Sequence, residues 1–180
     1  EHNLKNAMAA SAMAMVAGIP APVIRHTLRT FQGVEHRIEF VRELDGVRFI
    51  NDSKGTNVDS TIQAVRAMDR PTVLILGGYD KHCDFSPLVE VILQNPIERI
   101  VLIGKTADQI AGTLDQYGYT AYEHCGTDFE GAVRRAFERA QEGGNVLFSP
   151  SCASFDMFTD YEARGRIFKE IVNRMESIRK

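Results

Sequence analysis

The chain has 180 residues, of which 44% are hydrophobic and 25% charged, and its formal net charge is −3 at pH 7. These values are typical of one globular domain, or of one domain with an additional piece, and they argue against nucleic-acid binding, which usually relies on a basic surface. No apolar run approaches the ~20 residues that a membrane helix requires, so we expect no membrane partner.

The three cysteines, Cys83, Cys125 and Cys152, are odd in number and widely spaced. This pattern favours reduced thiols in a cytoplasmic protein. Two of them directly follow a histidine, but no C-x-x-C pair is present, so we expect no metal site. The chain begins with Glu-His-Asn, without methionine or a basic leading segment, which favours a start inside a longer protein over a signal peptide.

The N-terminal part predicts two helices. Residues 3–17 are rich in Ala and Met, which favour helix, and Gly18 is typical of a helix end. A second helix is expected from about residue 22 to residue 31, before a turn. We therefore divide the chain into residues 1–33 and 34–180. The first part has an apolar face, and we expect it to self-associate if no partner covers that face.

The pattern then changes to that of strands. Ile38 and Phe40 recur at every second position, which predicts a strand. Asp45-Gly46 is typical of a two-residue hairpin, and residues 47–51 would form the returning strand. Further strands are expected at residues 72–76, 99–103, 119–123 and 145–149.

Helical patterns separate these strands. Ser86 with Pro87 predicts a cap for a helix reaching about residue 94. Thr106 with Gln109, and Thr127 with Glu130, resemble capping boxes for the next two helices. A last helix carries an apolar face made of Tyr161, Phe168, Ile171, Val172, Met175 and Ile178. This alternation predicts an α/β fold with a Rossmann-like open sheet, mostly parallel with one antiparallel strand from the N-terminal hairpin, and helices on both faces.

Polar groups gather where the predicted strands end, which is where open α/β sheets bind ligands. Residues 51–57, N-D-S-K-G-T-N, offer a carboxylate, an ammonium group, hydroxyls and amides. A polar strand-to-helix turn capped by Asn57 explains them equally well. Lys54 and Lys81 each lie near a strand end and favour an anionic ligand. Gly77-Gly78 permits either close backbone approach or a plain turn.

Common catalytic motifs are absent from the sequence. It contains no G-x-G-x-x-G, no G-x-x-x-x-G-K-[ST] and no G-x-S-x-G. We therefore expect groups that position a ligand, without a catalytic residue in this chain.

Five segments, in this order and at similar separations, resemble the Mur ligase family: E-H-N-L-K-N-A-M-A-A at 1–10, G-V-E-H-R-I-E at 33–39, N-D-S-K-G-T-N at 51–57, G-G-Y-D-K at 77–81 and S-P-S-C-A-S-F-D at 149–156. Members that add other amino acids typically carry a different pattern in place of N-D-S-K. The resemblance therefore points to the branch that adds D-glutamate.

This resemblance implies ATP-driven amide formation in peptidoglycan synthesis in the bacterial cytoplasm. ATP with Mg²⁺ would activate the carboxylate of UDP-N-acetylmuramoyl-L-alanine as an acyl phosphate, which D-glutamate attacks. Residues 1–33 would be the C-terminal helical piece of the central ATP-binding domain, and residues 34–180 the C-terminal amino-acid and ATP-binding domain. The family's P-loop, UDP-binding domain and carbamylated lysine are missing from the sequence, so we expect the chain alone to be inactive.

Site residues follow from the resemblance by position. ATP contacts are implied at Asn3, Asn6, His36, Arg37, Asp52 and Lys54. D-Glutamate contacts are implied at Lys54, Thr56, Lys81, Ser154, Phe155 and Tyr161. Among these, Asn3 and Asn6 would face the adenine, Arg37 the phosphates and Asp52 the ribose. Gly55 and His82-Cys83 depart from the family pattern. Because of His82-Cys83, the family pattern does not predict the shape of the loop that follows the strand at residues 72–76.

Two alternatives stay open. The chain could be a stand-alone flavodoxin-like module that binds an acidic metabolite or nucleotide, or part of another Mur-type amino-acid ligase. A stand-alone module predicts micromolar binding of D-glutamate or ATP by the isolated chain, whereas a ligase part predicts weak binding or none.

Overall fold

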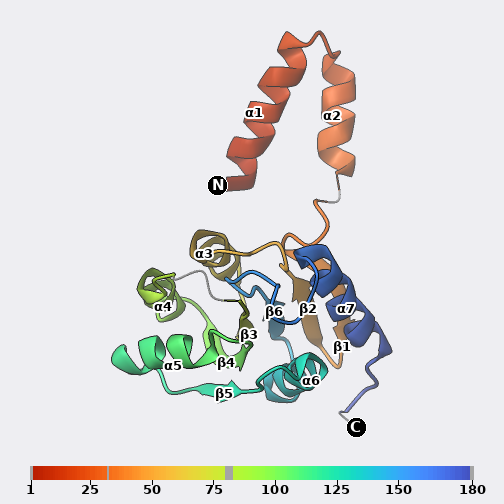
Figure 1. Cartoon of the computed structure of the whole chain (residues 1–180). Coiled ribbons are helices and arrows are strands. Elements are labelled where there is room, and N and C mark those ends of the chain that lie inside the picture. The colour runs from red at the N-terminus through yellow and green to blue at the C-terminus, as the bar shows by residue number, and fades with distance from the viewer. Residues whose placement is uncertain (1, 32, 80–82, 179–180) are drawn as a thin grey trace. The chain divides into compact units, whose positions relative to one another are not determined.

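The computed structural model describes residues 2–31, 33–79 and 83–178 (Figure 1). The chain divides into two compact units, Glu1–Val34 and Glu35–Lys180. In the first unit, α1 (His2–Val16) and α2 (Ala21–Thr30) form a helical hairpin. Gly18 ends α1 with a φ of 77°, a conformation that glycine adopts without strain, and its amide donates to the carbonyl of Met15.

In its described residues, the second unit is a six-stranded sheet covered by five helices. The strands are β1 (Glu39–Leu44), β2 (Val47–Asn51), β3 (Thr72–Gly77), β4 (Ile97–Ile103), β5 (Tyr122–His124) and β6 (Asn145–Phe148). The helices are α3 (Val58–Arg66), α4 (Ser86–Ile92), α5 (Ala107–Gln116), α6 (Phe129–Arg139) and α7 (Tyr161–Arg174). The strand order is β1-β2-β6-β3-β4-β5, and only β1 pairs antiparallel to its neighbour among the described strands. The predicted fold class is confirmed.

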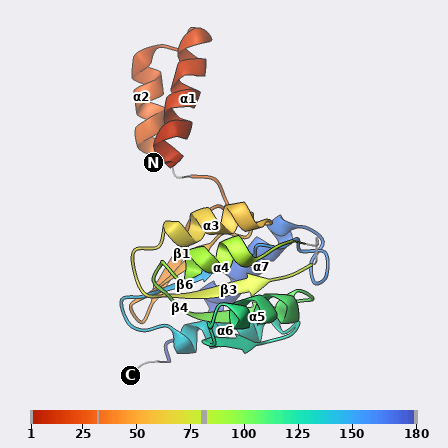
Figure 2. The same cartoon turned by 90° about the vertical axis from the view of Figure 1, so that its left-hand side faces the viewer.

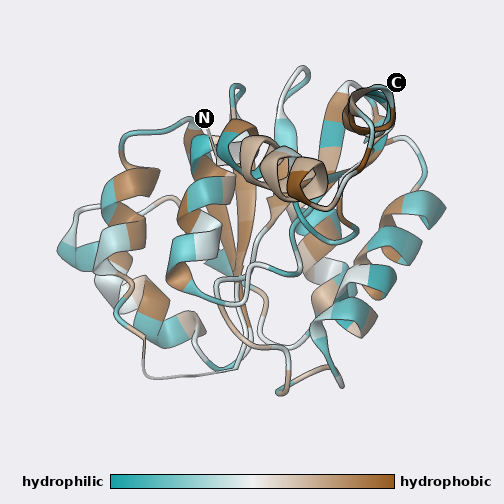
Figure 3. Cartoon of the chain, turned by 90° about the horizontal axis from the view of Figure 1, so that it is seen from above, coloured by the Kyte–Doolittle hydropathy of each residue, from teal (hydrophilic) through white to brown (hydrophobic). Residues whose placement is uncertain are grey.

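Helices cover both faces of this sheet. α3, α4 and α5 pack on one face and lie in front of the strands in Figure 2, whereas α6 and α7 pack on the other. Successive side chains of a strand point to opposite faces, so Leu74 and Leu76 contribute to the first core and Val73 and Ile75 to the second. This explains the continuous apolar runs of the central strands, which are brown in Figure 3.

The predicted hairpin is present between β1 and β2. Asp45 and Gly46 both have positive φ, 52° and 73°, as a type I′ turn requires. The pairing of β1 with β2 is irregular between Phe40 and Arg42, so one alternation does not hold along the whole strand: Leu44 packs against the core, but Phe40 does not. Phe40 is 60% exposed, while Val41 packs against the core.

Three predicted helix caps are wrong, although the helices exist. Ser86 is the first residue of α4, not its cap, and Pro87 follows it. Thr106 precedes α5 but forms no capping hydrogen bond. Its hydroxyl accepts a hydrogen bond from the amide of Gly78 (3.0 Å), so a tertiary contact competes with the cap. Before α6, Asp128 caps the helix in place of Thr127 by accepting from an amide of the first turn.

The predicted ends of several elements also shift. α4 ends at Ile92 and α6 at Arg139, earlier than expected, while β4 begins at Ile97, earlier than expected. Ile178 lies beyond α7 and is 54% exposed, so it does not belong to the apolar face of that helix.

Gly77 and Gly78 lie where loops from neighbouring strands meet. A Cβ on Gly77 would collide with the carbonyl of Ile103, and one on Gly78 would collide with the carbonyl of Ala153. The glycine pair therefore permits close approach of backbone to backbone at the end of the sheet. A plain turn does not account for it.

Candidate functional site

The carboxyl ends of β2 and β6 lie side by side, because these two strands pair in parallel. The amide of Asp52 extends the pairing by donating to the carbonyl of Phe148 (2.7 Å). The polar segment after β2 and the segment 149–160 after β6 are thus brought to one edge of the sheet, where the N-terminus of α7 also lies.

A pocket of about 250 Å³ opens between these three segments. Its lining residues are Thr56 from the loop after β2, Ala153, Ser154 and Phe155 from the loop after β6, and Asp160, Tyr161 and Glu162 from the start of α7. Four residues predicted to contact D-glutamate, Thr56, Ser154, Phe155 and Tyr161, therefore share one pocket. Ser154 is buried and Phe155 is 68% exposed. Their role in binding stays a prediction.

Charges of both signs surround this pocket. The ammonium group of Lys54 lies 5.6 Å from the centroid of the Tyr161 ring, within the range of a cation–π contact. On the other side, Asp160 accepts a hydrogen bond from the amide of Ala163, which lowers the pKa of this carboxyl group and keeps it ionised. A hydrogen bond to the Glu162 carboxylate raises the pKa of the Tyr161 hydroxyl. Lys81 lies outside the described residues.

Asp52 is buried beneath the edge of the sheet, with 3% of its surface exposed. One carboxylate oxygen accepts from the amide of Ile38 (3.1 Å), and the other accepts from the hydroxyl of Ser149 (2.6 Å). Burial raises the pKa of Asp52 to about 6, against these two hydrogen bonds, which lower it. The side chain thus ties the segment before β1 to the end of β6. The ribose contact predicted for it stays a prediction.

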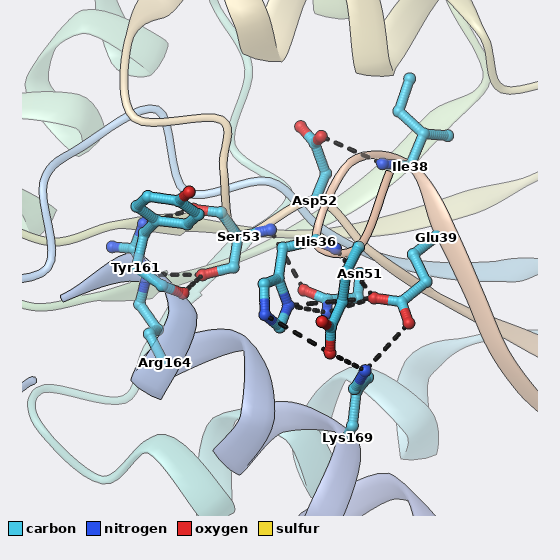
Figure 4. A network of polar contacts seen from close by, with 10 residues as sticks. His36, Ile38, Glu39, Asn51, Asp52, Ser53, Tyr161, Arg164 and Lys169 are labelled. Atoms are coloured by element: carbon cyan, nitrogen blue, oxygen red, sulfur yellow. Dashed lines mark hydrogen bonds and ion pairs between the residues drawn. The ribbon is translucent and has the colours of Figure 1, made fainter. Parts of the chain in front are cut away.

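His36 is the centre of a buried network that Figure 4 shows. The amide of Ser53 donates to Oδ1 of Asn51, so the side-chain nitrogen of Asn51 faces the His36 ring, 2.9 Å from Nδ1. Nδ1 must then accept, which places the ring proton on Nε2 and makes the ring neutral. Burial lowers the pKa of His36, in agreement with a neutral ring.

The same network joins α7 to the segment before β1. Lys169 on α7 donates to the carboxylates of Glu35 (2.7 Å) and Glu39 (2.9 Å), and the His36 ring packs against Gly165, where a Cβ would collide with it. His36 is held in the left-handed region, with a φ of 64°, and its carbonyl accepts from the amide of Lys54 (3.0 Å). The network therefore supports the backbone that carries Lys54.

Arg37 is exposed beside this network, and no hydrogen bond or ion pair engages it within residues 2–31, 33–79 and 83–178. Asn3 and Asn6 belong to α1, in the other unit. Asn6 is exposed, and the side chain of Asn3 is outside the described part of the structure. The predicted ATP contacts of these three residues stay predictions.

The sequence did not identify Arg164, although it is the largest fully buried side chain. Its guanidinium donates to the hydroxyl (3.1 Å) and carbonyl (2.9 Å) of Ser53, and to the carbonyls of Cys152 (3.1 Å) and Ala153 (3.2 Å). Burial lowers its pKa to about 10, so it stays charged at neutral pH. A signal was available: Arg164 follows Tyr161 by three residues and precedes Phe168 by four, which places a charge on the predicted apolar face.

The remaining features of the described residues concern metal ligands, thiols and membrane-spanning helices. No group of three or more His, Cys, Asp and Glu side chains among them is arranged to hold a metal ion. Cys83, Cys125 and Cys152 are free thiols. No helix in the described ranges is long and apolar enough to cross a membrane.

Comparisons with known proteins agree with this architecture. Residues 36–152 match the family model described as the glutamate ligase domain of Mur ligases. The chain is 52% identical, over 96% of its length, to the UDP-N-acetylmuramoylalanine–D-glutamate ligase of Thermoanaerobacter sp. strain X514. It is 47% identical, over 97% of its length, to the enzyme of the same name from Clostridioides difficile strain 630. It spans 38% of the length of both relatives.

Solved structures show the same fold. The UDP-N-acetylmuramate–alanine ligase of Thermotoga maritima matches 96% of this chain with a TM-score of 0.68 at 16% identity, and the chain covers 38% of it. The MurF ligase of Thermotoga maritima, in complex with ADP, matches 91% of this chain with a TM-score of 0.56 at 16% identity, and the chain covers 37% of it. From the family model and the relatives at about half identity, it follows that the chain belongs to the Mur ligase family.

Proposed function

We propose that this chain is the C-terminal, amino-acid-binding part of an ATP-dependent ligase that joins D-glutamate to UDP-N-acetylmuramoyl-L-alanine in bacterial peptidoglycan synthesis. The names of relatives that are 47–52% identical support this substrate pair. The observation that carries the proposal is the pocket in which Thr56, Ser154, Phe155 and Tyr161 meet, with Lys54 at its edge.

The chemistry of this pocket suits a dicarboxylic amino acid. Lys54 offers a positive charge, and Thr56 and Ser154 offer hydroxyl donors to carboxylate oxygens. The backbone amide at Phe155 adds a further donor, and the Tyr161 ring provides an apolar wall for the methylene groups. Lys81, from the loop after β3, would give the second carboxylate its cation. Held in this way, the amine of D-glutamate is oriented for attack, which is the main contribution that positioning makes to catalysis.

ATP with Mg²⁺ would supply the phosphoryl group that activates the carboxylate of the other substrate. Arg37 fits a phosphate contact, because its guanidinium is exposed near Asp52 and Tyr161 and forms no hydrogen bond or ion pair with a described residue. Lys54 would lie where the nucleotide and the amino acid meet. Asp52 would contact the ribose. His36 would belong to the ATP site as well as hold the backbone of Lys54. Asn3 and Asn6 would contact the adenine. The ADP bound to the MurF ligase of the same fold supports a nucleotide in this family.

We further propose that residues 1–33 belong to the central ATP-binding domain and residues 34–180 to the C-terminal domain. The sequence has no P-loop motif, and the chain spans 38% of its relatives' length. The chain alone then lacks the phosphate-binding groups and the site for the UDP-linked substrate, so it does not ligate. We place the complete enzyme in the cytoplasm.

A segment exchange tests this function. The chain replaces the matching segment of the Thermoanaerobacter ligase, and the purified hybrid is assayed for ATP-dependent joining of radiolabelled D-glutamate or L-glutamate to UDP-N-acetylmuramoyl-L-alanine. We expect ligation of D-glutamate, with L-glutamate at least about 100-fold poorer. A folded hybrid that prefers L-glutamate, or that ligates neither, would contradict the proposal.

The isolated 180-residue chain tests the claim that the chain alone does not ligate. Ligation by the chain alone would overturn its proposed inactivity. Micromolar binding of D-glutamate or ATP to the chain alone, measured by calorimetry, would favour a stand-alone binding module.

A further inference from the structure

We propose that Arg164 is a positioning residue that fixes the three segments of the pocket relative to one another and so sets the affinity for the amino-acid substrate. This inference rests on the proposed function for the identity of that substrate. It does not require Arg164 to contact the substrate, because Arg164 is fully buried and is not among the residues that line the pocket.

Each pocket segment connects to this one side chain. On one side, Arg164 holds the hydroxyl and the carbonyl of Ser53, three residues before Thr56. On the other, it holds the carbonyls of Cys152 and Ala153, directly before Ser154. The third segment is the start of its own helix. The hydroxyl of Ser53 donates to the carbonyl of Tyr161 (2.8 Å), which closes the set of contacts, and Figure 4 shows this side of the arrangement.

The nature of these contacts points to a role beyond stability. Within the described residues, every hydrogen-bond acceptor of Arg164 is a backbone carbonyl or the Ser53 hydroxyl, and none is a carboxylate. The carboxylates of Asp156 and Asp52 attract this charge but do not hydrogen-bond to it, and burying a charge without a hydrogen-bonded carboxylate costs more than filling the same space with an apolar side chain. The guanidinium instead fixes the arrangement of the two loops, because three of their backbone carbonyls bind to this one planar group.

The fork of the guanidinium is needed for this convergence. Its Nε and Nη2 atoms serve Ser53, while Nη1 serves Cys152 and Ala153, so the two loops are held from different edges of one rigid plane. A lysine keeps the charge but presents a single nitrogen, which cannot reach both loops with the same geometry. Arg164→Lys should therefore release one loop from the other while it preserves the charge beneath the pocket.

Hydrogen exchange in the 180-residue chain tests the positioning role without reference to catalysis. The matched control is Val172→Ala, which removes packing from the fully buried face of the same helix. At equal measured stability, adjusted with urea, we expect amides of residues 52–57 and 151–156 to exchange at least about tenfold faster in Arg164→Lys than in Val172→Ala. Equal exchange of these segments in the two variants would overturn the inference.

The hybrid ligase described above tests the consequence for the substrate. We expect Arg164→Lys to raise the KM for D-glutamate at least about tenfold, because the loops that hold this substrate are no longer fixed relative to each other, while the KM for ATP changes less than about twofold. Val172→Ala should leave both values unchanged. An equal increase of the KM for both substrates, or the same increase of the KM for D-glutamate in both variants, would assign Arg164 a purely structural role.

The two arms separate the possible failures. If the unsubstituted hybrid does not ligate D-glutamate, the proposed function fails, and the exchange experiment still decides whether Arg164 holds the loops together. If the hybrid ligates D-glutamate and Arg164→Lys behaves as Val172→Ala does, the proposed function stands and the role of Arg164 is refuted.

Discussion

The two units of this chain use similar apolar side chains in opposite ways. In residues 35–180, the apolar faces of strands and helices enclose two cores, one on each side of the sheet. In residues 2–31 and 33–34, by contrast, no described residue is buried. Apolar side chains that are at least 42% exposed occur along both of its helices and the adjoining turns: Leu4, Met8, Met13, Met15, Val16, Ile19, Val23, Leu28, Phe31 and Val34.

This contrast teaches that helix propensity and folding autonomy are different properties. The high helix propensity of Ala and Met favours a helix over residues 2–16. A helix in a protein nevertheless gains most of its stability from packing an apolar face against other elements. An exposed apolar surface of this kind is typical of an interaction site. We therefore expect the larger unit to fold by itself and the smaller one to depend on a partner, and to self-associate when none is present.

The largest expected effect comes from the core. Phe148 is fully buried and packs against the rings of Phe129 and Phe168, with centroids 5.1 Å and 5.0 Å away. Phe148→Ala should lower the free energy of unfolding by about 3–5 kcal/mol. Met13→Ala, at a side chain that is 68% exposed, should change it by less than about 0.5 kcal/mol. Urea unfolding followed by circular dichroism measures both; equal effects would remove the contrast between the units.

The second effect is a dependence of the unfolding free energy on pH, which arises from Asp52 in the larger unit. Burial raises the pKa of Asp52 from 3.8 to about 6, so between these values the folded state binds a proton that the unfolded state has lost. Its contribution to stability is full below pH ~4 and is lost as the pH rises through about 6, a change of about 3 kcal/mol.

Asp52→Asn removes this titration, so the difference in unfolding free energy between the parent and this variant should change by about 3 kcal/mol from pH 4 to pH 7. His36 contributes with the opposite sign: its lowered pKa means that stability is present above its ordinary value of 6.5 and is lost as the pH falls. Denaturant unfolding across this range measures the difference. A difference independent of pH would refute the buried titration of Asp52.

A smaller effect is expected at the helix starts. Asp160 caps α7 through the amide of Ala163, whereas α2 begins after Pro20 without a side-chain cap. Asp160→Ala should cost about 1 kcal/mol of stability. Thr27→Ala in α2, where the exposed hydroxyl bonds only within the helix, should cost less than about 0.5 kcal/mol. Thermal unfolding of the two variants compares them, and a larger loss at Thr27 would contradict the account.

A small effect on stability is expected even from the removal of the whole smaller unit. Removal of residues 1–34 should change the free energy of unfolding of the remainder by less than about 1 kcal/mol, because its cores are complete without them. The same deletion should abolish any concentration-dependent self-association seen in light scattering. A remainder that unfolds, or that associates as strongly as the parent, would show that the division is misplaced.

Sequence patterns predicted the features that depend on local chemistry. The continuous apolar runs of β3 and β6 identified buried strands, and Asp45-Gly46 identified the hairpin, because a type I′ turn needs residues that tolerate positive φ. The loops that form the pocket were also expected at one edge, since parallel strands place their carboxyl ends together.

Features that depend on contacts between residues distant in the sequence were not predicted. Thr106 looked like a helix cap, but its hydroxyl bonds to Gly78, and this partner cannot be read from neighbouring residues. The irregular pairing between Phe40 and Arg42 interrupts the alternation of β1, so Phe40 is exposed although Leu44 packs against the core. Arg164 was missed because a charged residue in an amphipathic helix is ordinarily assigned to solvent, whereas here convergent carbonyls from distant loops stabilise it in the interior.

The central claim is that the D-glutamate pocket lies within the larger unit. It is tested most directly by a hybrid ligase that carries only residues 35–180 of this chain, compared with its Thr56→Ala/Ser154→Ala variant. We predict a KM for D-glutamate at least about tenfold higher in the variant, since a hydrogen bond to a charged group contributes about 1.5–3 kcal/mol, and a KM for ATP within about twofold. An active, folded variant with an unchanged KM for D-glutamate would contradict the claim.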